Sequence, residues 1–172
     1  MSTVPLWTRM FVFAIAVASC QWAAGRERFR HVERSPHAGA IESGRSNTYF
    51  QSRHARHWQA DADGSASLHR QGSMQGYRGG AGSYQASRQR DEAGHASRQR
   101  SASLHGPNGA GIDRTGAVSR NPDGSVSGAR STTLTTPDGG HYDGSLAFSN
   151  GQVSYSGSCS DSGGHNAPCR RH

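Results

Sequence analysis

The stretch Phe148-Ser149-Asn150-Gly151-Gln152-Val153-Ser154-Tyr155 decides the fold. Asn-Gly accepts the positive φ angles of a two-residue hairpin turn, so it predicts a turn at residues 150–151. With that turn, Phe148 faces Val153 and Leu146 faces Tyr155, which places four apolar side chains on one face of a hairpin. The C-terminal region is therefore expected to form antiparallel strands.

A second hairpin is predicted immediately before the first. Pro137-Asp138-Gly139 has the residues of a three-residue loop with a bulge, because Pro fixes the first turn dihedral and Gly takes the left-handed position. This loop pairs Leu134 with Tyr142, but the same rule at Pro122-Asp123-Gly124 pairs Val118 with Gly128, a poorer match. Order is thus expected to be best over residues 131–158 and weakest over 80–100.

Glycines recur along the chain at a fixed interval. They stand fifteen residues apart at Gly64, Gly79, Gly94, Gly109, Gly124 and Gly139. Literal copies also occur, since residues 86–90 recur at 96–100, but this spacing of ten does not fit the fifteen-residue period, so the repeat is degenerate or has suffered insertions. We predict turn glycines at Gly109, Gly124, Gly139 and Gly151, in a unit that buries its apolar face only against neighbouring units.

Composition argues against a thick core. Hydrophobic residues make up 32% of the 172 residues, and the formal net charge is +7. All basic residues are Arg, and mean hydropathy is -0.79. So few large apolar side chains do not offset the ordering entropy of a two-layer domain. The predicted fold class is all-β: over residues 61–172, a thin Gly/Ser-rich meander or solenoid of short antiparallel hairpins with a repeat of about 15 residues.

Residues 20–60 are predicted to be a disordered, Arg-rich tether. Apolar periodicity is weak from Arg26 to Ala60, and Pro36, Gly39 and Gly44 interrupt any helix or strand. The tether either is a solvated linker or lays its arginines on anionic headgroups.

Residues 1–19 have the order of regions found in a secretory signal. An acid-free start ending in Arg9 precedes an apolar run and small residues, and the run is too short to span a bilayer. Val17-Ala18-Ser19-Cys20 resembles the processing site of bacterial lipoproteins. The resemblance implies lipidation of Cys20, a lipid anchor in a membrane and, with Gln21 next, the outer membrane. The alternative is ordinary cleavage after Ala18 or near Gly25, giving a periplasmic or extracellular protein.

Cysteine usage agrees with export. The chain has three cysteines, and lipidation of Cys20 leaves Cys159 and Cys169 to form a disulfide in an oxidising compartment. Tyr142-Asp143-Gly144 and residues 148–157 also resemble MORN repeats locally. That likeness implies hairpins and no specific function.

No catalytic motif and no cofactor site are evident, so we expect a protein that is not an enzyme and has no small-molecule substrate. Histidines such as His54 and His57, and the tail residues His165, Cys169 and His172, suggest metal binding as an alternative. Their spacing does not match a structural metal site, and the expected disulfide would remove Cys169 as a ligand.

Arginines offer a further function. Arg88, Arg90, Arg98 and Arg100 are candidates for binding a polyanion such as lipopolysaccharide, peptidoglycan or extracellular DNA, with Asp91, Glu92, Asp113 and Asp123 diluting their field. We expect an exported, lipid-anchored envelope protein with a structural or adhesive role, and polyanion binding is the alternative. Self-association through open strand edges follows as a corollary.

Overall fold

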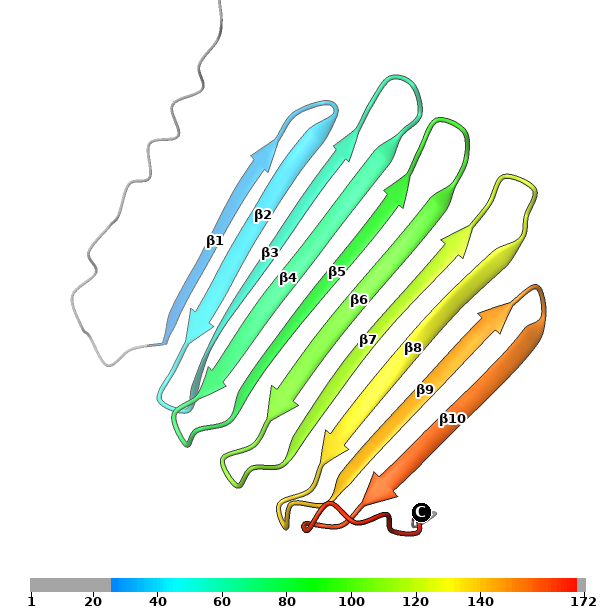
Figure 1. Ribbon diagram of the computed structural model, residues 1–172. Helices are drawn as coiled ribbons and strands as arrows, with labels where there is room; N and C mark the ends of the chain where they lie inside the picture. The colour runs from blue at the N-terminus through cyan, green and yellow to red at the C-terminus, as the bar shows by residue number, and fades with distance from the viewer. Residues whose placement is uncertain (1–25, 170–172) are drawn as a thin grey trace, which may run out of the picture.

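The computed structural model describes residues 26–169 as one sheet of antiparallel strands, each hydrogen-bonded to the next in chain order. Figure 1 shows the strands side by side from β1 at one edge to β10 at the other. The all-β meander predicted from the sequence is confirmed. The strands are β1 Glu27–Arg34, β2 Ala38–Ser46, β3 Phe50–Ala60, β4 Ala66–Gly76, β5 Ala81–Arg90, β6 Ala96–His105, β7 Gly111–Arg120, β8 Val126–Thr135, β9 His141–Ser149 and β10 Gln152–Ser160.

Glycine turns connect the later strands, as the fifteen-residue spacing predicts. Gly109, Gly124 and Gly139 have φ of 82°, 86° and 86°. At the third of these turns, the Gly139 amide donates to the Thr136 carbonyl and the Thr136 amide donates to the Gly140 carbonyl. This is a three-residue loop closed by a bulge. Asn150 and Gly151, with φ of 47° and 84°, form the two-residue turn.

The predicted pairings are also present. Phe148 lies opposite Val153, Leu146 opposite Tyr155, and Leu134 opposite Tyr142. Each fifteen-residue unit is one strand plus one turn, so successive turns fall at opposite ends of the sheet (Figure 1). The copies at 86–90 and 96–100 are the two strands of one hairpin and face each other. Strands β5 and β6 pair over their full lengths, so the decline in order expected over 80–100 is absent from the pairing.

The sheet has no second layer, and no hydrophobic side chain among residues 26–169 is buried. Packing comes instead from aromatic rings that lie over glycines of the adjacent strand. Phe148 is paired with Gly128, Tyr84 with Gly72, and Trp58 with Gly39. A Cβ built on Gly128 would lie 2.6 Å from the Phe148 ring, so the ring occupies the space that a side chain would take. These aromatic–glycine pairs provide local packing at glycine positions, which would otherwise weaken the strands.

The tether predicted for residues 20–60 is wrong over 27–60, where β1, β2 and β3 belong to the same sheet. These strands lack the apolar alternation by which half-buried strands are recognised, because both faces of this sheet are open to water. Charged residues alternate along these strands instead, as Arg28 and Arg30 do on one face of β1. Residues 20–25 lie outside the described part of the chain.

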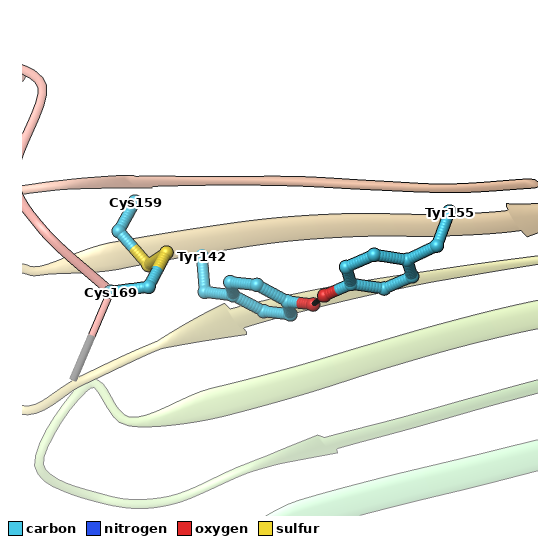
Figure 2. The surroundings of a disulfide bond; sticks show 4 residues. All are labelled: Tyr142, Tyr155, Cys159 and Cys169. Atoms are coloured by element: carbon cyan, nitrogen blue, oxygen red, sulfur yellow. Dashed lines mark hydrogen bonds between the residues drawn. A yellow bond between two sulfur atoms is a disulfide. The ribbon is translucent and has the colours of Figure 1, made fainter. Parts of the chain in front are cut away.

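The C-terminal end of the sheet is closed by a disulfide between Cys159 and Cys169, with a Cα–Cα distance of 5.4 Å. It holds the tail against β10, where the Ala167 amide donates to the Cys159 carbonyl. Figure 2 shows the hydroxyls of Tyr142 and Tyr155 meeting beside this bond. That hydrogen bond raises the pKa of Tyr142 above its ordinary value. The predicted disulfide is thus present, and it fastens one corner of the sheet.

Candidate polyanion-binding face

Strand geometry sorts the charged residues onto two different faces. Side chains alternate along each strand, and those that lie opposite each other across a strand pair share a face. One face carries even-numbered residues in β1 and β3 to β9, and odd-numbered residues in β2 and β10. Every strand arginine except Arg53 stands on this side, which we call the arginine face. They are Arg28, Arg30, Arg34, Arg45, Arg56, Arg70, Arg88, Arg90, Arg98, Arg100, Arg114, Arg120 and Arg130.

Strand carboxylates stand only on the opposite side, which we call the serine face for its abundant Ser residues. They are Glu27, Glu33, Glu42, Asp113 and Asp143. The remaining described carboxylates are in the turns; Asp91, Glu92 and Asp123 are examples. Asp113, one of the acids expected to dilute the field of the arginines, therefore has its side chain on the other face, beside His105.

The structure brings together the arginines that the sequence singled out. Arg88 and Arg90 stand on β5, Arg98 and Arg100 stand on β6, and all four share the arginine face. Arg88 lies directly opposite Arg98. The spacing of two within each pair, which is the period of a strand, was already visible in the sequence.

Like charges face each other at three places on the arginine face. The cross-strand pairs are Arg28 with Arg45, Arg56 with Arg70, and Arg88 with Arg98. Like charges placed directly opposite destabilise a sheet, whereas an anion lying across such a pair would be attracted by both guanidinium groups. The three Arg–Arg pairs therefore destabilise a sheet that has no hydrophobic core, and a bound anion would offset that cost.

A second line of arginines crosses the strands in register. Arg70 lies opposite Ala86, Ala86 opposite Arg100, Arg100 opposite Gly116, and Gly116 opposite Arg130. Adjacent strands are about 4.8 Å apart, so arginines on alternate strands recur roughly every 10 Å. The small residues between them leave room for groups of a ligand to approach the guanidinium planes. The line suits an extended polymer laid across the strands.

Aromatic and aliphatic side chains lie among these arginines. The Arg56 guanidinium is 5.5 Å from the Trp58 ring centroid. Leu104, Ile112 and Leu134 form a continuous row across β6, β7 and β8, and Leu104 is 49% exposed. The arginine face therefore offers both cationic and apolar contacts.

The serine face is a weaker candidate. It is hollowed into a trough of about 840 Å³ across the middle strands, whose lining includes His57, His69, Thr115 and Ser131. Some of its hydroxyls bond to each other, as in the bond of 2.6 Å between Thr115 and Ser131 and that of 2.7 Å between Ser145 and Ser156. A hydroxyl pair still has a free donor and free lone pairs, but this face also carries the strand carboxylates, which repel an anionic ligand.

The structure separates the histidines proposed as metal ligands. His54 stands on the arginine face and bonds to the Tyr84 hydroxyl, whereas His57 stands on the serine face. His165 is in the last turn beside Asp161, and Cys169 is in the disulfide. Over residues 26–169, no group of three or more His, Cys, Asp or Glu is arranged to hold an ion. Cys20 and His172 lie outside the described residues.

Comparison of the chain with protein-family models, with curated proteins and with solved structures gave no match. Between residues 26 and 169, no helix has the length and apolar character needed to cross a membrane.

Proposed function

We propose that this protein is a non-enzymatic adhesive scaffold of the cell envelope that binds anionic polymers through its arginine face. The observation that carries the proposal is the separation of charge. All strand arginines except Arg53 stand on one side, with three direct Arg–Arg pairs among them, and the strand carboxylates stand on the other side. Structural adhesion and polyanion binding, which are alternatives at the level of the sequence, become one function in this proposal.

The ligand class follows from guanidinium chemistry. Arginine binds phosphate and carboxylate in a two-pronged geometry that lysine does not reproduce, and every basic residue of this chain is Arg. Lipopolysaccharide, peptidoglycan and extracellular DNA all carry such groups. The exposed apolar row at Leu104 favours ligands that also present acyl chains or sugar rings.

The location is a separate part of the proposal and depends on residues 1–25. Export by the N-terminal signal would place the arginine face where envelope polymers are, and lipidation of Cys20 would anchor the chain in the outer membrane. The mass of the mature N-terminus tests this part. An acylated Cys20 supports the anchor, and an unmodified N-terminus at Ser19 or near Arg26 would contradict it.

The salt dependence of binding tests the arginine face. Full-length protein is titrated with heparin, lipopolysaccharide and duplex DNA at several salt concentrations. Each phosphate contact contributes roughly 0.7–0.9 to the slope of log K against log salt. The double variant Arg98→Gln/Arg100→Gln should therefore lower the slope by about 1.5.

The matched control is Arg53→Gln/Arg78→Gln, which removes the same charge from the serine face and from the turn after β4. Its slope should stay close to that of the wild type. Equal losses in both double variants would mean that only net charge matters, and the proposed face would be wrong. The ligand that binds most tightly at high salt identifies the polymer.

A further inference from the structure

A discrete hollow lies on the arginine face over β1, β2 and β3, around the Arg28–Arg45 pair and away from the arginines of β4 to β8. It has a volume of about 620 Å³. Its polar lining comprises Arg28, Arg30, Arg45, Ser43, Ser52 and His54, and no carboxylate lines it. The hollow is shallow and open to solvent, and it has room for a small anionic group.

Strand register explains why these side chains share the hollow. Arg28 lies opposite Arg45, which lies opposite Ser52 on the next strand. In the neighbouring row, Arg30 lies opposite Ser43, and Ser43 opposite His54. Two adjacent rows therefore bring three guanidinium groups and two hydroxyls together, and each of these groups can donate a hydrogen bond.

Arg45 supplies an independent observation. Its guanidinium carbon lies 5.7 Å from the Phe50 ring centroid, which holds the side chain over the sheet. Its Nε atom is buried and has no hydrogen-bond partner. Buried donors are normally paired, and Arg45 also lines the hollow, so a small shift of this side chain would let an acceptor bound there reach the unpaired Nε.

We propose that this hollow binds a phosphate monoester. A phosphate group carries close to two negative charges at neutral pH and has three acceptor oxygens. Arg28, Arg30 and Arg45 would donate to these oxygens, and Ser43 and Ser52 would complete the contacts. The Phe50 ring would lie against the organic part of the ligand. This site is distinct from the extended polymer surface, because it is local and would hold one small group.

Calorimetric titration of the full-length chain tests the proposal, with inorganic phosphate and glycerol 3-phosphate as soluble probes. Vesicles of phosphatidylcholine with and without phosphatidic acid test the same chemistry on a lipid headgroup. We expect saturable binding of one phosphate group per chain. Binding of the soluble probes assigns the site to free phosphate monoesters, and binding of the phosphatidic acid vesicles alone assigns it to a lipid. No binding of any probe overturns the proposal.

Variants then locate the site. Arg45→Gln should weaken binding at least tenfold, and Arg45→Lys should not restore it, because lysine keeps the charge but lacks the Nε donor. Arg120→Gln is the matched control, with the same charge change on the same face but outside the hollow, and it should weaken binding less than twofold. Equal losses in Arg45→Gln and Arg120→Gln would overturn the proposal.

Two further measurements keep the result interpretable. Arg28→Gln, in the fully exposed strand β1, provides a second lining variant if Arg45→Gln does not fold, and it too should weaken binding. Heparin retention of Arg45→Gln should fall only by the share of one charge. If heparin binding fails in the wild type while phosphate binding persists, the polymer-binding function is wrong and the hollow stands, and the reverse result removes the hollow alone.

Discussion

The packing of aromatic rings on glycines predicts opposite effects for one substitution at two positions. In Gly128→Ala, the new Cβ would lie 2.6 Å from two ring carbons of Phe148 and 2.6 Å from the Ala117 carbonyl oxygen. Both the ring and the Ala117 carbonyl must shift, and overpacking of this kind costs about 1–3 kcal/mol. In Gly116→Ala, the nearest atom is the Ala129 carbonyl oxygen at 3.5 Å, an ordinary contact.

Gly116→Ala should therefore stabilise the sheet by about 0.5–1 kcal/mol, since alanine loses less conformational freedom on folding. The two variants should differ by roughly 2 kcal/mol in unfolding free energy, or on the order of 1 M in the urea midpoint. Urea unfolding followed by far-ultraviolet circular dichroism measures this. Equal shifts of the urea midpoint in the two variants, or a stabilising Gly128→Ala, would show that packing of the Phe148 ring does not require a glycine at position 128.

Three other outcomes are expected. Reducing the Cys159–Cys169 disulfide should cost about 3 kcal/mol of stability through the entropy of loop closure. Hydrogen exchange should show that the Ala167 amide loses its protection while the amides of β2 to β9 stay protected. Loss of protection over the entire sheet would contradict this. Hydrogen bonds from Ser125 lower the pKa of Asp123, and those from Ser65 lower the pKa of Asp63. Both turns should therefore be stabilised above pH 4 and lose that stabilisation as the pH falls through the lowered pKa values. Unfolding midpoints measured over a pH series should show a smaller acid dependence in Asp123→Ala, and an unchanged acid dependence would refute the role of the turn. Any self-association of the full-length chain through the exposed edge strand β10 should be reduced by Ser156→Lys, as measured by sedimentation velocity. The control Ser101→Lys, in the central strand β6, should leave an edge contact intact. A larger effect of Ser101→Lys than of Ser156→Lys would place the contact on a face of the sheet.

Turn chemistry and apolar alternation made the C-terminal hairpins predictable from sequence. The loop length is fixed by Asn150-Gly151 in one hairpin and by Pro137-Asp138-Gly139 in the other, and loop length fixes the register of the strands. The pairing of Leu146 with Tyr155 could therefore be worked out from the sequence alone. The pairing of Val118 with Gly128 looked poor because only one neighbouring strand was considered. Gly128 has Phe148 on its other side, and that ring supplies the missing packing.

Strands β1 to β3 escaped prediction because the hydrophobic pattern that reveals strands reflects burial, and this sheet buries almost nothing. For the same reason, the arginine face was only partly foreseen. A net charge summed along the chain hides a separation that appears only when Asp113 and Arg114 are assigned to opposite sides of one strand. The hollow at Arg45 combines three strands, and a linear sequence gives no register for strands that were not recognised.

The strict neighbour-to-neighbour order of the meander bears on how such a chain can evolve. Each strand is hydrogen-bonded through its backbone only to those before and after it, so no strand pairing depends on the total number of strands. Inserting or deleting thirty residues at the turns adds or removes one complete hairpin, keeps the same side chains on the same side, and leaves the terminal disulfide untouched. Gene duplication or slippage could thus change the width of the sheet in fixed steps without redesigning the rest of the molecule.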